Sequence, residues 1–421
     1  MMLKFGTVKS GLTLCVFALL ALPVARAAAK PESVGLSEER LGRIHDAMQR
    51  HIDAHDISGA VTLVARKGQI AWFHSQGLMD IDGNKPMQKD AIFRVFSMSK
   101  PVTGAAILML LEEGKVRLTD PVSKFIPEFK GSKVAVMQDR PAGAPASSQP
   151  MYYTVPATHE ITIQDLLTHT SGLASGGRAS SHELGNLIDI VGSRTLADMM
   201  PKFAASPLDF QPGSRWTYSP LAGFDTLGRV VEVASGMSFD QFLRRRIFTP
   251  LGMKTTAFYP GDDHWSSVVT AYHRTDGSLT KTQNPNRLQS KTYFSGAGGL
   301  VSTAEDYAQF ALMLSAGGQW NGNRLLSPKT VELMSSVFVP DTLPGRGPGR
   351  SWGLSVEVIS DPIAAGHRVS KGSFGWDGAF GTHFWVDPKE KLVGVMMIQT
   401  DNPDRQVDRD FENAVMQAIV E

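Results

Sequence analysis

A serine and a lysine three residues apart are the first candidates for chemistry in this 421-residue chain. Ser97 and Lys100 stand at the start of an apolar run, residues 102–113, that predicts a helix. Residues at positions i and i+3 of a helix share a face, so Lys100 is expected beside the Ser97 hydroxyl. A serine hydroxyl becomes a useful nucleophile when a neighbouring base takes its proton. Free amides at the helix N-terminus can stabilise an oxyanion, so these parts suit acyl transfer.

Two other serines match catalytic patterns but lack the elements that those patterns need. The Ser-x-x-Lys spacing recurs at Ser278, which follows an Asp-Gly turn and leads into a loop-like run at 283–286. Ser351 lies in a Gly-x-Ser-x-Gly motif, which in α/β-hydrolases requires a strand before it and a helix after it. Here a Gly/Pro-rich loop precedes Ser351 and a strand-like run follows it. We therefore predict Ser97 as the nucleophile.

The composition is that of an ordinary globular protein with a processed N-terminus. With 42% hydrophobic residues and a net charge of +1, the chain suits one large or two moderate domains, and its charge does not favour nucleic acid or an anionic membrane surface. Residues 1–27 have the basic, apolar and Ala-x-Ala regions of a signal peptide. The single cysteine, Cys15, lies within it. We therefore predict a bacterial periplasmic or secreted protein without disulfides or a membrane span.

The elements that must position these groups come from both ends of the chain. A capped helix is expected at 38–52, followed by strands at 60–65 and 70–73. The C-terminal part predicts strands at 352–358, 382–387 and 392–399, then a helix at 411–420. Between these parts lies a Pro/Ala/Ser-rich loop within 131–158 and a mostly helical stretch at 162–248. We therefore expect a discontinuous α/β domain, 28–105 plus 291–421, with a mostly helical domain, 106–290, inserted.

Five motifs in order give the chain a family resemblance. They are residues 93–102, 166–173, 212–219, 250–253 and 298–306. Together they resemble the class C β-lactamase-like serine hydrolases, especially the family VIII carboxylesterases, from about residue 31 to the C-terminus. The resemblance implies an antiparallel sheet flanked by helices, as in β-lactamases and penicillin-binding proteins.

The resemblance also implies roles for particular residues. The family's Ser-x-x-Lys motif is matched by Ser97 and Lys100, and the tyrosine of its Tyr-x-Asn motif by Tyr218. Ser97 would form the acyl-enzyme, while Lys100 and Tyr218 would share the general acid and base work. The oxyanion hole would use the backbone amides of Ser97 and Ala379.

The third family motif is Lys-Thr-Gly in lactamases and often Trp-x-Gly in esterases, and we place it at Trp376, Asp377 and Gly378. These three residues would bind substrate. Trp376 lacks the charge with which a lactamase lysine meets the β-lactam carboxylate, and Pro220 replaces the asparagine of the second motif. Both changes favour neutral acyl substrates. Asp377 could repel anions or attract an amine, or it could be a turn residue beside Gly378.

Several histidines and tryptophans have a structural role as an alternative to a functional one. His169 is expected to be a structural hydrogen-bonding residue. His367 and His383 could line the cleft, although a buried or surface role is favoured for each. No metal-ligand spacing occurs, so we predict neither a metal nor another cofactor. Three tryptophans could line an acyl pocket, although aromatic residues are more often core: Trp216, Trp376 and Trp385.

The sequence therefore predicts a serine hydrolase that cleaves small-molecule carboxylic esters, with short acyl chains, through a Ser97 acyl-enzyme and with weak or no β-lactamase activity. One alternative is a D-amino-acid peptidase, amidase or acyltransferase on the same scaffold. Another is a non-catalytic penicillin-recognising or cell-wall binding module. The intact Ser97, Lys100 and Tyr218 favour an enzyme.

Overall fold

The computed structural model describes residues 1–2, 29–139, 149–185, 194–401, 404 and 406–421. The signal peptide expected at 1–27 lies outside these residues, apart from Met1 and Met2, as does the Pro/Ala/Ser-rich run at 141–148. Among the helices of the described part, none combines the length and apolarity needed to cross a bilayer. Export and the periplasmic or secreted location stay predictions.

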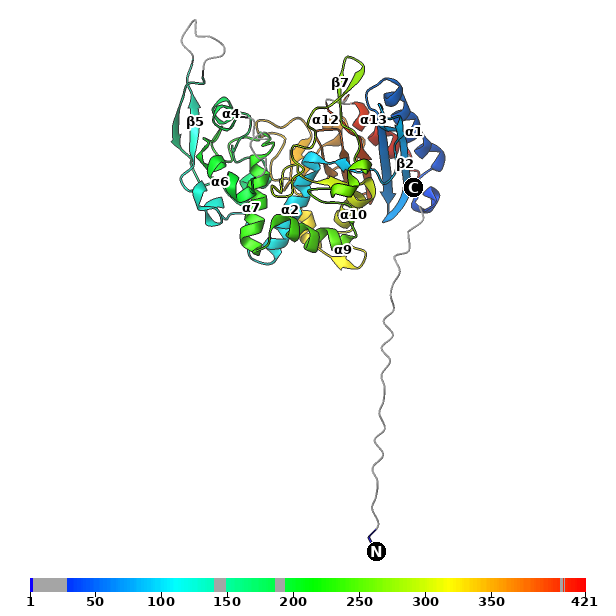
Figure 1. Ribbon diagram of the computed structural model, residues 1–421, viewed down its shortest axis with the longest axis horizontal. Coiled ribbons are helices and arrows are strands. Elements are labelled where there is room, and N and C mark those ends of the chain that lie inside the picture. Colours follow the sequence, from blue (N-terminus) through cyan, green and yellow to red (C-terminus); the bar gives the residue numbers. More distant parts are fainter. Residues whose placement is uncertain (3–28, 140–148, 186–193, 402–403, 405) are drawn as a thin grey trace.

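An eight-stranded antiparallel sheet is the largest sheet of the described residues. In spatial order its strands are β12 (Arg350–Trp352), β13 (Glu357–Ile359), β14 (Phe374–Asp377), β15 (His383–Asp387), β16 (Leu392–Met397), β1 (Gly59–Arg66), β2 (Gln69–Asp80) and β3 (Lys85–Pro86). Its strand β2 lies beside α1 (Glu38–Asp53), on the side of the molecule away from α4 (Arg178–Leu184) and α6 (Leu196–Ala205) (Figure 1). The pairing of β1 with β16, which sets Val61 opposite Met397, joins the two ends of the chain. The predicted α/β fold with an antiparallel sheet is therefore confirmed.

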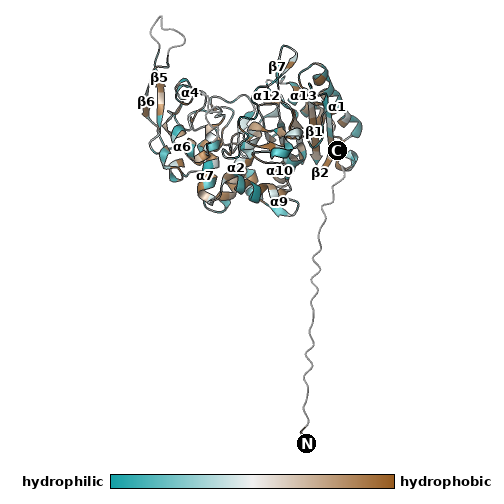
Figure 2. Cartoon of the chain, in the orientation of Figure 1, coloured by the Kyte–Doolittle hydropathy of each residue, from teal (hydrophilic) through white to brown (hydrophobic). Residues whose placement is uncertain are grey.

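Helices cover both faces of this sheet because alternate residues of its central strand point to opposite sides. Ala60 and Val64 of β1 pack with α1 (Glu38–Asp53) and α13 (Gln406–Met416) in one apolar cluster. Val61 and Leu63 pack in a second cluster with α2 (Ser99–Glu112) and α10 (Ala304–Ser315). In Figure 2 the strands near β1 are mostly apolar, whereas α1 at the outside carries hydrophilic segments.

The inserted part contains the helices α3 (Ile163–Leu167), α4 (Arg178–Leu184), α6 (Leu196–Ala205), α7 (Ala222–Ser235), α8 (Phe239–Leu243) and α9 (Thr249–Leu251). It also contains two hairpins, β5 (Lys133–Met137) with β6 (Tyr152–Pro156), and β7 (Tyr272–Thr275) with β8 (Ser278–Lys281). The remaining strands and α-helices of the described residues are β4 (Phe93–Arg94), β9 (Val301–Ser302), β10 (Gln319–Trp320), β11 (Asn323–Arg324), β17 (Thr400–Asp401), α11 (Pro328–Met334) and α12 (Pro362–Ala365).

Two local predictions were wrong. The strands β5 and β6, which the sequence analysis did not predict, flank the Pro/Ala/Ser-rich loop at 141–148, and that loop lies outside the described residues. The strand expected at 352–358 is two strands, since β12 ends at Trp352 and β13 begins at Glu357. The last helix begins at Gln406 and ends at Met416, earlier than the expected 411–420.

The division into two domains stays a prediction. Its first boundary, between residues 105 and 106, lies inside α2. One apolar cluster includes residues from both proposed parts, such as Phe384 of the sheet and Phe224 of α7.

The helix α2 lies in the interior, as expected for a helix that is mostly apolar all round. Every residue from Ser99 to Leu110 is buried. The helix also packs closely against the turn between β12 and β13: a Cβ atom on Gly104 would lie 2.0 Å from the Oγ and 2.7 Å from the Cβ of Ser355. Ser355 is itself fully buried, so this contact fixes the position of α2.

We expect Gly104→Ala to lower the free energy of unfolding by about 1–3 kcal/mol, because the added methyl overpacks this contact. Denaturant unfolding measures the change. Gly42→Ala on α1 is the matched control, because a Cβ atom added at Gly42 would meet nothing within 4 Å. That control should be neutral or stabilising by up to about 1 kcal/mol. A Gly104→Ala protein as stable as wild type would contradict the close contact.

Candidate active site

Ser97 lies in a single 3-10 turn, Phe96–Met98, between β4 and α2. Phe96, the residue before it, has a φ of +42°, a left-handed conformation that is uncommon for a large side chain. The Phe96 ring stacks on Phe380 with centroids 4.7 Å apart. The turn therefore presents Ser97 from a backbone conformation that surrounding packing maintains.

Lys100 is fully buried and lies beside Ser97, as the spacing predicts. Its Nζ atom is 3.2 Å from Ser97 Oγ, 2.9 Å from the Pro220 carbonyl oxygen and 2.8 Å from the Ala297 carbonyl oxygen. The two carbonyl groups can only accept hydrogen bonds. When the amine is neutral, its two N–H groups can satisfy them and leave the lone pair directed at Ser97. The arrangement therefore suits proton transfer from serine to lysine.

Tyr218 lies against this pair from the segment that precedes α7. The centre of its ring is 4.9 Å from Lys100 Nζ. Its hydroxyl accepts a hydrogen bond of 3.4 Å from the Trp376 indole N–H. The structure thus brings together Ser97, Lys100, Tyr218 and Trp376, from three separate parts of the chain.

His169 holds in place the segment that contains Tyr218. The Ser219 amide donates to His169 Nδ1 over 3.1 Å, and the Thr217 amide donates to the His169 carbonyl oxygen. Burial, with the charges of Lys100 and Arg346, holds the pKa of His169 well below its usual value. The ring is therefore neutral, and because Nδ1 accepts, the proton is assigned to Nε2. His169 has the structural hydrogen-bonding role that the sequence predicts.

The third motif reaches the site from the end of β14. Trp376 packs edge-on against Trp352, with centroids 4.5 Å apart, and tilts against Tyr218. A Cβ atom on Gly378 would lie 2.6 Å from the Val95 carbonyl oxygen. This close approach requires a glycine, and it brings Ala379 to the cavity that contains Ser97.

Two cavities meet at Ala379. The first has a volume of about 310 Å³, contains Ser97, and is mostly apolar. Its described lining includes Ala174, Leu184, Leu221, Leu288 and Ala297. The second has a volume of about 710 Å³ and is lined by Trp376 and by charged residues that include Asp377, His383 and Arg409.

Of the three candidate tryptophans, Trp385 is a buried core residue, and Trp216 and Trp376 are half-buried. None of the three candidates is among the described residues that line the Ser97 cavity. Trp385 is buried in the apolar cluster under α13, where it packs against Phe411. Trp216 packs beneath the guanidinium group of Arg346, 4.4 Å from its ring centre. Trp385 and Trp216 therefore do not form the acyl pocket, while Trp376 lines the larger cavity.

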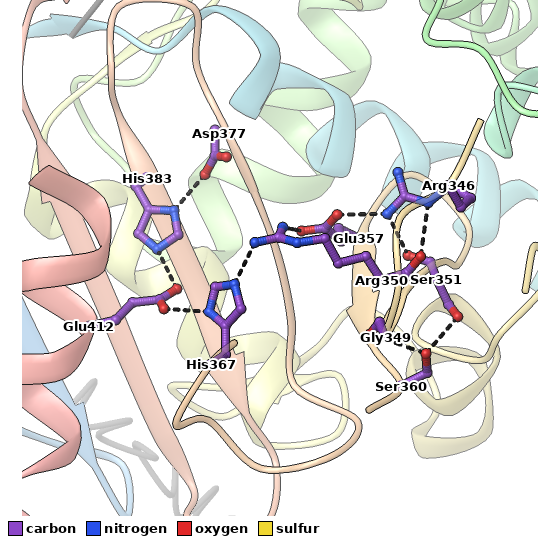
Figure 3. Close-up of polar contacts among 10 residues, drawn as sticks. All are labelled: Arg346, Gly349, Arg350, Ser351, Glu357, Ser360, His367, Asp377, His383 and Glu412. Atoms are coloured by element: carbon purple, nitrogen blue, oxygen red, sulfur yellow. Dashed lines mark hydrogen bonds and ion pairs between the residues drawn. The ribbon is translucent and has the colours of Figure 1, made fainter. Parts of the chain in front are cut away.

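A chain of ion pairs runs from Asp377 of the third motif, whose side chain is exposed, to the largely buried Glu412 of the last helix (Figure 3). His383 Nδ1 lies 2.5 Å from Asp377 Oδ1, and its Nε2 lies 3.2 Å from Glu412 Oε1. Glu412 also accepts from His367 Nδ1 over 2.8 Å, and Arg350 donates to His367 Nε2 over 2.5 Å. His367 and His383 thus connect β14, β15 and α13, and both have buried roles.

The charges along this chain follow from its contacts. Burial disfavours the charged forms of His383 and Glu412, but their partners outweigh it. Asp377 and Glu412 raise the pKa of His383 well above its usual value. Hydrogen bonds from His367 and His383 lower the pKa of Glu412 to about 2. Asp377 is therefore the last residue of a strand and the partner of an imidazolium, and the turn interpretation was wrong.

The two other serines that match catalytic patterns, Ser278 and Ser351, lack a neighbouring base and a following helix. Ser278 begins the exposed strand β8. Ser351 is buried in β12, where its hydroxyl donates to Ser360 Oγ over 2.8 Å (Figure 3). The strand–turn–helix context that Gly-x-Ser-x-Gly needs is replaced by a hairpin. Neither serine has the setting of a nucleophile.

Two carboxylates near the site were missed in the sequence. Asp225 is an acidic residue among apolar and small residues in the first turns of α7, and that position was the signal of a buried role. Glu412 carries no such signal, because it lies in an ordinary amphipathic helix 35 residues after Asp377.

Comparisons with known proteins agree with this geometry. The family model described as Beta-lactamase matches residues 44–417. Protein Rv1367c of Mycobacterium tuberculosis is 35% identical over 85% of this chain and 89% of its own length. Esterase EstB of Burkholderia gladioli is 29% identical over 81% of this chain and 86% of its own. The solved structure of "EstCE1, a hydrolase with promiscuous acyltransferase activity" has a TM-score of 0.76 and 27% identity, covering 90% of this chain and 99% of that one.

The chain belongs to the beta-lactamase family. It is a serine hydrolase of the beta-lactamase fold, and its similarity to Esterase EstB and to the hydrolase EstCE1 supports the resemblance to family VIII carboxylesterases.

Glu412 should stabilise the fold in a pH-dependent way. A pKa of about 2 in the folded state, against an ordinary 4.5, corresponds to about 3 kcal/mol. Because the folded pKa is the lower one, this contribution is present above pH 4.5 and is lost as the pH falls toward 2. Glu412→Gln should therefore lower the free energy of unfolding by about 3 kcal/mol at pH 7, and by less at pH 3.

Urea unfolding at the two pH values measures this difference. Glu128→Gln is the control, since Glu128 is exposed, and a surface change of this kind is expected to alter stability by about 0.5 kcal/mol or less. An equal loss for Glu412→Gln at pH 7 and pH 3 would contradict the pKa assignment.

Proposed function

We propose that this enzyme hydrolyses carboxylic esters by transferring the acyl group to Ser97. The observation that carries the proposal is the position of the buried Lys100 amine. Its Nζ atom lies 3.2 Å from Ser97 Oγ and is hydrogen-bonded to two carbonyl oxygens. A base held in this way needs no further reorganisation before it accepts the serine proton.

The proposed reaction has two steps. Ser97 Oγ attacks the ester carbonyl carbon while Lys100 takes its proton, and the amides of Ser97 and Ala379 stabilise the oxyanion. The C–O bond to the alcohol then breaks, and the alcohol leaves with a proton supplied through Tyr218 and Lys100. Water attacks the acyl-enzyme in the same way, giving its proton to this pair, and the carboxylic acid leaves as Ser97 regains a proton.

The proposed substrates are neutral esters with short acyl chains. The cavity at Ser97 is mostly apolar and about 310 Å³ in volume, at the low end for ligand pockets. Trp376 gives the third motif no positive charge, so a β-lactam carboxylate has no lysine there to bind. The names of the relatives, an esterase and a hydrolase, support this class of substrate.

Acyl transfer to an alcohol is the second candidate, because the structural neighbour EstCE1 is described as a hydrolase with promiscuous acyltransferase activity. The same acyl-enzyme would serve both outcomes. The peptidase or amidase alternative has less support, because the Asp377 carboxylate is already paired with His383. Comparing an ester, a D-alanyl amide and a cephalosporin as substrates separates these activities.

Export is a further part of the proposal. The basic, apolar and Ala-x-Ala sequence at 1–27 supports cleavage after Ala27 and a periplasmic or secreted location.

Ser97→Ala should abolish the hydrolysis of nitrophenyl butyrate, because the alanine cannot form an acyl-enzyme. We expect a fall in kcat of about 10⁴-fold or more. Ser278→Ala and Ser351→Ala are matched controls, one in the other Ser-x-x-Lys and one in the Gly-x-Ser-x-Gly motif, and each should keep most of the activity. Full activity in Ser97→Ala would refute the proposed nucleophile, and activity lost only in Ser351→Ala would move it to the other motif.

Tyr218→Phe tests the second motif. The phenylalanine keeps the ring that packs on His169 and Trp376 but removes the hydroxyl that would relay protons. We expect kcat to fall by about 10²- to 10⁴-fold while the melting temperature changes little. A variant with wild-type kcat would show that Tyr218 only packs against the site.

A further inference from the structure

The carboxylate of Asp225 is fully enclosed near the site. Asp225 lies on α7 and has no exposed surface. Its Oδ2 accepts a hydrogen bond of 2.5 Å from the Tyr293 hydroxyl. Its Oδ1 accepts from Ser295 Oγ over 2.7 Å and from the Ala297 amide over 3.1 Å. All three donors lie on one segment, residues 293–297.

The segment 293–297 also contacts Lys100, the proposed base. The Ala297 amide binds Asp225, while the Ala297 carbonyl oxygen accepts from Lys100 Nζ over 2.8 Å. The Ser295 hydroxyl, which donates to Asp225, accepts from the Gly298 amide over 3.2 Å. Gly298 lines the cavity of Ser97. A single residue, Ala297, therefore connects the Asp225 carboxylate to the lysine amine.

We propose that Asp225 is a positioning residue that acts through Ala297 to direct the Lys100 amine at Ser97. The inference rests on the proposed function, since it concerns the lysine that takes the serine proton. If the segment 293–297 moved, the Ala297 carbonyl would no longer take one of the two N–H groups. The lone pair would then lose its fixed direction toward Ser97 Oγ.

The negative charge of Asp225 also favours proton transfer from Ser97 to Lys100. Proton transfer from Ser97 turns Lys100 into an ammonium ion in a buried site, where a nearby negative charge stabilises it. The titratable groups that face Asp225 are Lys100 and Tyr293. Burial outweighs their effect and that of the hydrogen bonds, and raises the pKa of Asp225 to about 6. The carboxylate is therefore present above about pH 6, and is lost as the pH falls through that value.

Asp306 supplies a matched control. It is also a buried carboxylate on a helix, and it also ties down a neighbouring segment. It accepts from the Thr255 amide over 2.7 Å, from the Thr256 amide over 2.9 Å and from Thr256 Oγ1 over 3.0 Å. These bonds hold residues 255–256 and not the segment that contacts Lys100, so Asp306→Asn reports the general effect of losing a buried carboxylate.

The experiment compares Asp225→Asn and Asp306→Asn in full-length protein with nitrophenyl butyrate. Both should lose thermal stability. Only Asp225→Asn should lower kcat, by about 10- to 100-fold, with KM changed by less than about threefold. The wild-type component of kcat that falls through about pH 6 should disappear in Asp225→Asn. An equal kcat loss in both variants, or an unchanged pH profile, would overturn the proposal.

The rate at which a fluorophosphonate modifies Ser97 separates this inference from the proposed function. Labelling requires an activated serine but no ester turnover. If wild type labels but does not hydrolyse esters, the proposed function fails, and slower labelling of Asp225→Asn still supports the positioning role. If Asp225→Asn does not fold, Ser295→Ala keeps the charge and removes one tie, and should slow labelling about tenfold. A wild-type rate in that variant would count against the proposal.

Discussion

The burial of one lysine amine is the constraint on which the site depends. Burying an amine away from water is unfavourable unless its N–H groups are hydrogen-bonded. Here the Pro220 and Ala297 carbonyl oxygens meet that need from two loops that are 77 residues apart. Other bonds fix the helix beneath: Thr103 Oγ1 donates to the Gly296 carbonyl oxygen over 2.7 Å, and Tyr307 donates to the Met98 carbonyl oxygen over 2.7 Å.

The sheet brings the third motif to this helix. Gly378 allows β14 to end against Val95, just before the turn that presents Ser97. The ion pairs through His383 and Glu412 then tie β14 and β15 to the last helix, which packs on the opposite face of the sheet. The C-terminal helix, although far from the reacting atoms, therefore helps to hold the strand that would supply one oxyanion amide.

Patterns of side chains made much of this predictable. The Ser-x-x-Lys spacing before an apolar run located Ser97 and Lys100, and apolar runs at both ends located the sheet. The backbone carbonyls of Pro220 and Ala297 leave no trace in a sequence, because every residue has one. Glu412 is far in sequence from its partner His383, and Asp225 is far from its partner Ala297, so only the folded chain shows that these groups meet. The short strands β5 and β6, which flank the Pro/Ala/Ser-rich run, were not predicted.

The central claim is that Ser97, activated by Lys100, is the residue that carries the acyl group. Mass mapping of the protein trapped with a nitrophenyl ester at low pH measures this directly. The account predicts an added acyl mass on the peptide containing Ser97, and none on the peptides containing Ser278 or Ser351. An acyl group on either of those peptides, or turnover of the ester with no acyl group on Ser97, would contradict it.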